Sequence, residues 1–388
     1  MIKELKVIEL ASVLAGPSVG QFFAELGAEV IKIENPESGG DVTRSWKSKD
    51  EKKADISAYF SCTNWGKKSL TLNLKERAGL AILYDLIKQS DLVITSYKPG
   101  DAEKLNVDYE CLSSLNSKLI YAEITGYGGH VQRVGYDAII QAESGFMHMN
   151  GQSDGPPTKM PVAVIDVIAG HHLKEAILLA LILRMQNGKG RRVSVSLMDA
   201  AISSLVNQAA NHLVAGVNPR RKGSIHPTIA PYGELFVTID GKELILAVGN
   251  DKQFKGLCQI LGLAHLADHK KFKDNQARVS NRNKLETYLS PKIATFTAND
   301  LMSKLNEKQI PAGVITSVAE TLDQKNIEDL LLKSDRYAGL RRFAASGIEI
   351  PSHILPPPCL GMHNEAILAQ KLGLSTTEVQ ELSERGII

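Results

Sequence analysis

The sequence has almost no excess of charge of one sign and few cysteines, and each shortage excludes a class of protein. Its 388 residues carry 45 Lys and Arg against 43 Asp and Glu, a formal net charge of +2. Nucleic-acid binding is therefore disfavoured as a main task, because phosphate recognition normally leaves a basic surplus. The four cysteines stand far apart without a Cys-x-x-Cys pair. Neither a disulfide framework nor a structural zinc site is expected.

Long hydrophobic runs are also missing. The longest unbroken apolar run spans the eight residues 176–183, between Glu175 and Arg184. Such a run is too short to cross a bilayer and is typical of a buried helix. Met1 to Glu4 lead directly into a strand-like run, which leaves no room for a signal peptide. With 43% hydrophobic and 23% charged residues the composition is that of a globular protein, and we expect a cytoplasmic enzyme.

Apolar strands alternate with helical stretches through the first half of the chain. Helices are predicted over 76–89 and 166–185, and alternation of this kind favours βαβ units and a parallel sheet. The predicted strands are 6–10, 29–34, 69–74, 91–95, 118–124 and 191–196.

A different texture begins near residue 223. Runs 233–239 and 242–248 alternate in polarity around Asp240-Gly241, which predicts a hairpin with a type I′ turn. We therefore expect four parts in an α/β protein. They are a large α/β domain over 1–200, a linker over 201–224, a small α+β domain over 225–320, and a return segment over 321–388 that completes the large domain.

Three common nucleotide or hydrolase motifs are absent. The first strand is followed by Ala15-Gly16-Pro17 without the G-x-G-x-x-G pattern of dinucleotide-binding folds. Neither a P-loop nor a G-x-S-x-G nucleophile elbow occurs. His171 and His172 are adjacent, so on a helix they diverge by about 100° and do not form a metal pair. We expect no metal and no permanently bound cofactor.

Asp166 is the most unusual polar residue of the sequence. It lies between the apolar runs 162–165 and 167–170, at the predicted start of a long helix. An unpaired buried carboxylate is costly, so this residue needs a role. It is the N-cap of the helix, a catalytic group, or both, since a helix N-terminus also stabilises a carboxylate anion.

Several separate segments, in order along the whole chain, resemble the family III CoA-transferases, to which formyl-CoA transferase and carnitine CoA-transferase belong. Each segment alone is a weak signal, but all of them in order are specific. They are 14–17 (LAGP), 26–34 (LGAEVIKIE), 40–44 (GDVTR), 64–70 (NWGKKSL), 97–100 (YKPG), 166–170 (DVIAG), 187–200 (NGKGRRVSVSLMDA), 226–227 (HP), 231–233 (PYG) and 249–251 (GND).

The resemblance implies a fold, a reaction and an assembly. The fold would be a Rossmann-like large domain with a small domain, two chains interlocking as a homodimer. Acyl-CoA and a carboxylic acid would be the substrates, with CoA exchanged through an aspartyl mixed anhydride and thioester on Asp166. Membrane and nucleic-acid partners are not expected.

The resemblance also assigns positions to the substrates. Tyr136 matches a tyrosine near the reacting thioester, and Leu14, Gly223 and His226 match the substrate pocket, with 223–230 in the place of a flexible cover loop. Leu14 stands where formyl-CoA transferase has a glutamine, and that enzyme's four-glycine run is absent, so formyl-CoA and oxalate are disfavoured. A small dicarboxylate such as succinate or mesaconate is expected instead. The matching CoA-binding positions are Val13, Leu72, Ser96, Tyr97, Lys98, Lys104 and Leu105.

Two other functions stay open at this point. Racemases of the superfamily carry a His-Asp pair where this chain has Tyr136-Asp137. A phenol with a pKa near 10 is a poor proton shuttle near neutral pH. A CoA-binding protein without turnover is the non-enzymatic alternative, although binding alone does not need a carboxylate at the position of Asp166.

Overall fold

The computed structural model describes residues 2–49, 51 and 56–388, which form two compact units. The larger unit comprises residues up to 146, 159–215 and 327–388, and the smaller one comprises 147–158 and 216–326. This division differs from the sequence-based boundaries in several places, and residues 321–326, expected in the return segment, lie in the smaller unit. Residues 201–215, expected as a linker, are mostly helical and belong to the larger unit, while 147–158 lie with the smaller unit.

A six-stranded sheet forms the centre of the larger unit, and every pairing in it is parallel. The strand order is β3-β2-β1-β4-β5-β6, so the direction of winding reverses between β1 and β4. The predicted α/β class is confirmed. The strands are β1 (Lys6–Leu10), β2 (Glu29–Glu34), β3 (Lys67–Thr71), β4 (Leu92–Thr95), β5 (Ile120–Thr125) and β6 (Arg191–Ser196).

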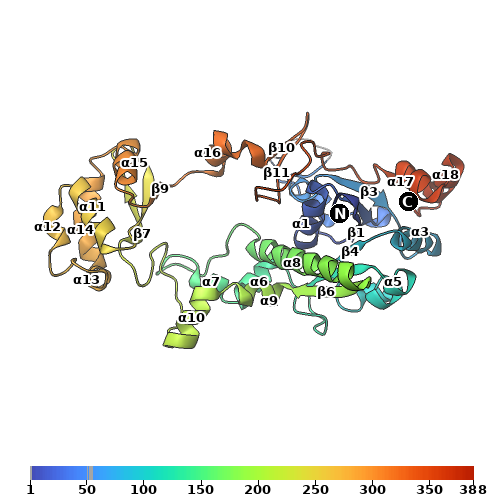
Figure 1. The fold of residues 1–388 in the computed structure, drawn as a ribbon, viewed down its shortest axis with the longest axis horizontal. Coiled ribbons are helices and arrows are strands. Elements are labelled where there is room, and N and C mark those ends of the chain that lie inside the picture. Colours follow the sequence, from blue (N-terminus) through green and yellow to red (C-terminus); the bar gives the residue numbers. More distant parts are fainter. Residues whose placement is uncertain (1, 50, 52–55) are drawn as a thin grey trace. The chain divides into compact units, whose positions relative to one another are not determined.

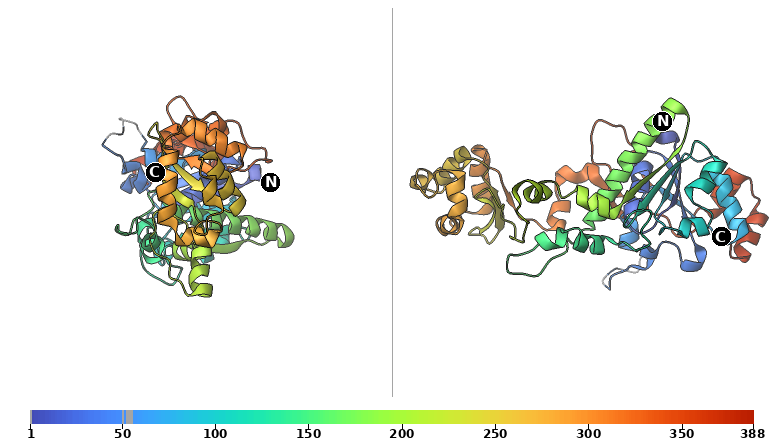
Figure 2. Two further views of the ribbon diagram at one scale, coloured as in Figure 1. Left: turned by 90° about the vertical axis from the view of Figure 1, so that its left-hand side faces the viewer. Right: turned by 90° about the horizontal axis from the view of Figure 1, so that it is seen from below.

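Helices cover both faces of this sheet, as buried parallel sheets require (Figures 1 and 2). Alternate strand residues feed two hydrophobic cores: Val7 packs on one face and Ile8 on the other. The first core is covered by α1 (Ala15–Glu25), α6 (Asp137–Glu143), α8 (Val164–Asn187) and α9 (Leu197–Ser203). The second is covered by α3 (Arg77–Lys88), α5 (Tyr109–Leu115), α17 (Asn364–Leu372) and α18 (Thr376–Glu384).

The edge strand β3 is closed by residues from the far end of the chain. The Ser69 N–H donates to His363 Nδ1 (3.1 Å), and the Thr71 N–H donates to Asn364 Oδ1 (3.0 Å). The His363 N–H in turn donates to the Ser69 carbonyl (3.0 Å). Two side chains and one amide thus occupy backbone groups of Ser69 and Thr71 that a seventh strand would otherwise pair with, which protects this part of the edge.

Charged side chains interrupt the apolar pattern on the α1 face of the sheet. Glu9 of β1, Lys32 of β2 and Lys67 of β3 are each at most 1% exposed. They alternate with apolar residues that belong to the opposite core, such as Ile8 and Ile31. The strand signal in these segments is therefore correct, although the face toward α1 carries buried charges beside apolar residues such as Val7 and Val30.

The smaller unit packs helices on a three-stranded antiparallel sheet in the order β7-β8-β9. Its strands are β7 (Tyr232–Val237), β8 (Glu243–Ala247) and β9 (Ala312–Val314). Its main helices are α11 (Asp251–Ile260), α12 (Ala264–Ala267), α13 (Asn275–Ser280), α14 (Arg282–Ile293), α15 (Ala298–Glu307) and α16 (Val318–Leu322).

The hairpin between β7 and β8 forms as predicted, but its turn does not. A type I′ turn needs positive φ at both central residues, and only Gly241 (φ 73°) is left-handed there. The Gly241 N–H donates to the Thr238 carbonyl (3.0 Å), and the Thr238 N–H donates to the Lys242 carbonyl (3.0 Å). The loop therefore has three residues, with the glycine in the position of a G1 bulge.

Short elements complete the fold. None of the helices in the described part of the chain is both long and apolar enough to span a membrane. The short elements are η1 (Ile2–Glu4), η2 (Pro36–Ser38), η3 (Val42–Ser45), α2 (Ala58–Ser61), α4 (Asp101–Lys104), α7 (Phe146–Met149), α10 (Val206–Ala215), η4 (Lys325–Leu330), β10 (Leu331–Lys333) and β11 (Ala338–Leu340).

Candidate active site

A cavity of about 230 Å³ opens at the carboxyl ends of the central strands, where the winding of the sheet reverses. Open α/β sheets bind ligands at this point, because the loops leaving the two neighbouring strands diverge there. The loop after β1, the loop after β4 and the end of β5 supply most of the wall. The lining residues are 12–16, 96–99, 124–126, 133–136, Asp166 and Leu197.

Asp166 lies on this wall and is 7% exposed. It is the third residue of α8, whose N-cap is Ala163, so the alternative that Asp166 itself caps the helix is wrong. Among the residues the structure describes, none makes a hydrogen bond or ion pair with its carboxylate. Burial, together with the negative charge of Asp137, raises the pKa of Asp166 to about 7. The result is a carboxyl group that is poorly solvated, unpaired and exposed to the cavity.

Asp137 fixes the start of α8 from outside the helix. Its Oδ1 accepts the Ile165 N–H (2.8 Å), and its Oδ2 accepts from Gln141 Nε2 (2.7 Å). Gln141 Oε1 accepts the Met160 N–H (2.9 Å). Residues of α6 therefore hold both the first turn of α8 and the segment that precedes it. Sequence reasoning missed these roles, because a cap supplied by another helix has no local signature; only the Tyr136-Asp137 pair drew notice.

Tyr59 of α2 is a second group that the sequence did not single out. Burial, followed by the charge of Asp166, raises the pKa of Tyr59 to about 12. Its hydroxyl therefore stays protonated within electrostatic range of the Asp166 carboxyl group. The ring packs edge-on against Trp46, with the ring centroids 5.0 Å apart.

Four of the seven positions predicted to bind CoA line the cavity: Val13, Ser96, Tyr97 and Lys98. The Lys98 side chain is exposed and makes no ion pair with a described residue.

The other three lie elsewhere. Leu72 is fully buried in the second core, and Leu105 packs against that core. Lys104 is exposed and pairs with Asp101 (2.9 Å). The structure thus brings the loop residues after β1 and β4 together, while Leu72, Lys104 and Leu105 remain predictions that rest on the resemblance.

The predicted substrate residues fall into two groups. Leu14 and Tyr136 line the cavity, and Tyr136 is 53% exposed. Gly223 and His226 belong to the smaller unit, where Gly223 has the left-handed φ of 62°.

The segment 223–230 in the smaller unit is held by several hydrogen bonds. Arg282 Nη2 donates to the carbonyls of His226 (2.6 Å) and Ile229 (2.7 Å). Asn275 Nδ2 donates to the Thr228 carbonyl (2.8 Å). The backbone of segment 223–230 is therefore fixed by residues of the smaller unit.

The cavity, its unpaired carboxyl group and the open α/β fold agree with a match across the chain: a model of CoA-transferase family III matches residues 2–363. The chain belongs to CoA-transferase family III. The predicted family and enzyme class are thereby confirmed.

Proteins named as CoA-transferases are similar over most of the chain. The succinate–glutarate CoA-transferase of Agrobacterium fabrum is 40% identical over 380 residues, with 94% of each chain covered. The acetyl-CoA:oxalate CoA-transferase of Acetobacter aceti is 34% identical over 336 residues, with 85% of each chain covered. A crystal structure of a CaiB/BaiF family protein from Brucella suis gives a TM-score of 0.85 at 37% identity, covering 95% of this chain and 99% of that one.

Proposed function

We propose that this family III CoA-transferase moves CoA from an acyl-CoA to a small dicarboxylate through covalent intermediates on Asp166. The observation that carries the proposal is the buried, unpaired Asp166 carboxyl group on the wall of the cavity. A carboxylate without hydrogen-bond donors is a better nucleophile than a solvated one, and the anhydride that it forms remains reactive enough to pass the acyl group on.

The reaction balances in four steps. The Asp166 carboxylate attacks the thioester carbonyl, which forms a mixed anhydride and releases the CoA thiolate. The thiolate then attacks the aspartyl carbonyl, which gives an Asp166–CoA thioester and frees the donor carboxylate. The acceptor carboxylate attacks that thioester and forms a second anhydride with release of thiolate. Attack of the thiolate on the acceptor carbonyl yields the new acyl-CoA and restores Asp166.

A dicarboxylate acceptor is supported by the names of two relatives, and the cavity offers a cation for CoA. The two relatives described above are named for succinate and glutarate and for oxalate. Two cationic side chains, Lys98 and Arg133, line the same cavity. Lys98 is free of ion pairs within the described chain, whereas Arg133 is held by Glu143 through Nη1 (3.0 Å) and Nη2 (2.5 Å). Lys98 is therefore the cation available to an anionic group of the substrates, and we assign it to CoA.

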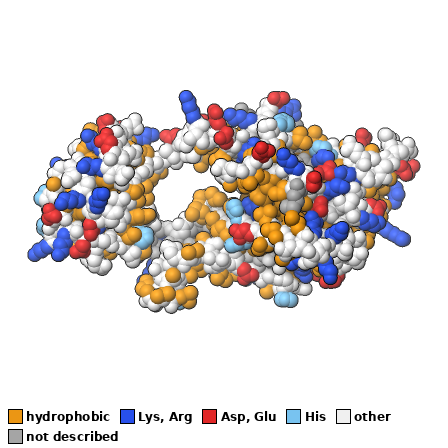
Figure 3. Space-filling model, in the orientation of Figure 1, with side chains coloured by type: hydrophobic (Ala, Val, Ile, Leu, Met, Phe, Trp, Pro, Cys, Tyr) orange, Lys and Arg blue, Asp and Glu red, His pale blue; other side chains and the backbone are white. Residues whose placement is uncertain are grey.

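We also infer a homodimer of interlocked chains. Large apolar side chains are exposed on the second half of α8 and on α10 of the larger unit. Figure 3 shows apolar side chains gathered over α10. Exposed apolar side chains that gather as they do over α10 are typical of an interaction site. The exposed side chains are Leu179, Ile182, Leu183, Met185, Val206, Leu213 and Val214.

Trapping the covalent intermediate tests the mechanism. The protein is incubated with succinyl-CoA or acetyl-CoA, quenched with hydroxylamine or borohydride, and examined by peptide mass spectrometry. We expect modification at Asp166, loss of transfer in Asp166→Ala with CoA binding retained, and full activity in Asp85→Asn, an exposed aspartate of α3. Acceptor preference is read from glutarate, succinate, mesaconate and oxalate against acetate.

An unmodified Asp166 in a protein that still binds acyl-CoA would overturn the proposal. Exchange of the α-proton of a 2-methylacyl-CoA in deuterium oxide would then identify a racemase. Binding with neither transfer nor exchange would identify a CoA-binding protein.

A further inference from the structure

Val13 has a backbone conformation that valine rarely adopts. Its φ is 72°, in the left-handed region, and the residue lies on the wall of the cavity. For a β-branched residue this conformation is a strained outlier, and it persists only where the surroundings hold it. The hydrogen bonds around Val13 therefore identify the groups that hold its backbone in the left-handed conformation.

The Val13 N–H points at the carboxylate of Asp41, with both Oδ atoms 3.3 Å from the nitrogen. Asp41 is 5% exposed and is fixed in turn by Thr43, whose N–H (3.0 Å) and Oγ1 (2.8 Å) donate to Oδ1. Lys32 Nζ lies 2.9 Å from Asp41 Oδ2. The acceptor for the strained amide is thus itself held from two sides.

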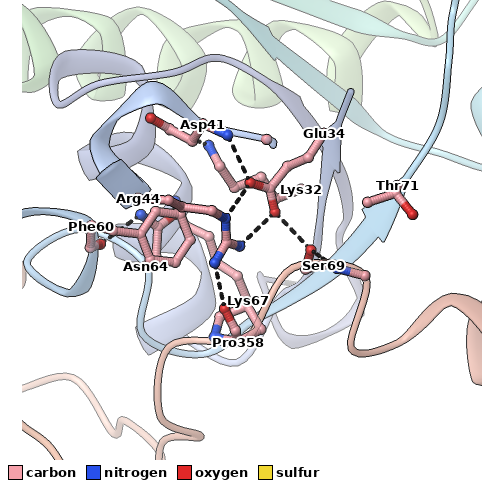
Figure 4. Close-up of polar contacts among 12 residues, drawn as sticks. Lys32, Glu34, Asp41, Arg44, Phe60, Asn64, Lys67, Ser69, Thr71 and Pro358 are labelled. Carbon is pink, nitrogen blue, oxygen red and sulfur yellow. Dashed lines mark hydrogen bonds and ion pairs between the residues drawn. The ribbon is translucent and has the colours of Figure 1, made fainter. Parts of the chain in front are cut away.

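Two buried ammonium groups grip the backbone before and after Val13. Lys32 Nζ donates to the carbonyl of Ala11 (2.7 Å), and Lys67 Nζ donates to the carbonyl of Pro17 (2.9 Å). Both ammonium groups also donate to Glu9 Oε1, at 3.0 and 2.9 Å. Figure 4 shows Lys32, Asp41 and Lys67 near the neighbouring ion pair of Glu34 and Arg44.

The surrounding helix makes room for this cluster. A Cβ on Gly20 of α1 would lie 1.8 Å from Glu9 Oε2. The two acids and two bases cancel in charge, yet buried ion pairs are often no more stabilising than apolar residues of the same volume. Stability alone therefore does not account for the cluster, whereas the shape of the loop does.

The conformation of the loop at Val13 sets the position of the first turn of α1, which follows directly. Leu14 is the N-cap of α1, and residues 14–16 line the cavity together with Asp166. N–H groups in the first turn of a helix have no intrahelical acceptor. Preorganised amides of this kind stabilise negative charge that develops on a reacting carbonyl oxygen.

We propose that Asp41, backed by Lys32, is a positioning residue for acyl transfer: by holding Val13 left-handed it keeps the first turn of α1 on the cavity wall that carries Asp166. The inference rests on the proposed function of this cavity. It assigns no substrate contact to Asp41, which acts only through the loop.

A double-mutant cycle isolates this role. Glycine adopts a φ of 72° without strain, so Val13→Gly removes the need for enforcement, while Val13→Thr keeps the β-branch and serves as the matched control. Asp41→Asn is expected to lower kcat by about 10- to 100-fold, as losses of preorganised donors do, with a KM for acyl-CoA changed less than about 3-fold. When Asp41→Asn is added to Val13→Gly, the loss of kcat that it causes should shrink to less than about 3-fold. When it is added to Val13→Thr, the loss should be as large as in the unmodified protein. Glu37→Gln, an exposed carboxylate 3.9 Å from Lys75, should leave activity unchanged.

Hydrogen exchange gives a readout that does not depend on Asp166. Asp41→Asn should speed exchange of the amides of 12–16 in the valine and threonine backgrounds and not in the glycine background. If Asp41→Asn fails to fold, Thr43→Val, which removes one donor to Asp41, is used in the same cycle. Equal losses of kcat in both Val13 backgrounds would overturn the proposal. Failure to trap an adduct on Asp166, with the exchange pattern as expected, would overturn the proposed function alone.

Discussion

The carboxyl group of Asp166 combines two properties that oppose each other. Burial without a partner makes it reactive, but the same burial raises its pKa to about 7, so near neutral pH a large share of the protein holds it protonated. A protonated carboxyl group cannot attack a thioester. Asp137 therefore has two effects: it caps the first turn of α8 at Ile165, and its negative charge opposes ionisation of Asp166.

The pH dependence of the reaction should report this balance. We expect kcat/KM to rise with pH and level off above a midpoint near pH 7, because the ionised form of Asp166 is the nucleophile. Asp137→Asn removes a neighbouring negative charge, which favours ionisation of Asp166 and moves the midpoint to lower pH. Initial rates from about pH 5 to pH 9 measure the shift.

Asp85→Asn provides the control, since Asp85 is exposed and pairs with Lys88 on α3. Its midpoint should coincide with that of the unmodified protein. A midpoint that stays fixed in Asp137→Asn would mean that Asp137 does not act on the ionisation of Asp166.

At the scale of the elements, the position of Asp166 depends on how closely α1 and α8 cross. Gly170 lies one turn after Asp166, and a Cβ there would come within 2.6 Å of Ser18 Oγ and 3.3 Å of the Ala15 carbonyl oxygen. Gly170 thus permits the contact that places the start of α8 beside the cavity.

Gly170→Ala should therefore lower the free energy of unfolding by about 1–3 kcal/mol, the usual cost of overpacking, and should reduce kcat. The first close contact disappears in Ser18→Ala, so the added cost of Gly170→Ala should fall in that background. Urea denaturation of the two single variants and the double variant measures the coupling. An equal cost in both backgrounds would show that Ser18 is not the obstacle.

The sequence predicted elements whose local signals are strong. The strands at 6–10, 29–34 and 191–196 have the predicted bounds, because β-branched side chains and flanking turn residues mark them locally. The turn at Asp240-Gly241 was assigned to the wrong type, since the dipeptide fits both loop lengths and the hydrogen bonds of Thr238 decide between them.

The sequence did not predict the features of the site that depend on tertiary contacts. Asp166 was recognisable as a polar residue in an apolar run, and the resemblance ranked it as the nucleophile. The cap from Asp137, the hydroxyl of Tyr59 and the grip of Lys32 on Ala11 join segments far apart in the chain. No local pattern encodes such contacts.

At the scale of the whole molecule, the exposed apolar surface of α8 and α10 predicts self-association. Leu213 is 80% and Val214 is 87% exposed. Light scattering after size exclusion should give about 84 kDa, twice the 42.2 kDa of the chain. The double substitution Leu213→Glu with Val214→Glu should shift the mass toward the monomer, because burying two carboxylates in an apolar contact is costly.

Lys252→Glu, an exposed change in the smaller unit, should leave the dimer mass unaltered. A protein of about 42 kDa at all concentrations, or a dimer indifferent to the α10 substitutions, would contradict this assignment of the interface.

The closure of β3 by His363 and Asn364 has a consequence for synthesis on the ribosome. The edge strand is translated well before its hydrogen-bond partners, which lie 294 and 293 residues further along the chain. The larger unit therefore cannot be completed until residues 363 and 364 have emerged from the ribosome. The smaller unit, most of it the continuous stretch 216–326, is fully synthesised before then, and domains generally fold as units. Until residue 364 emerges, the open edge of β3 is the part of the nascent chain that needs protection from aggregation.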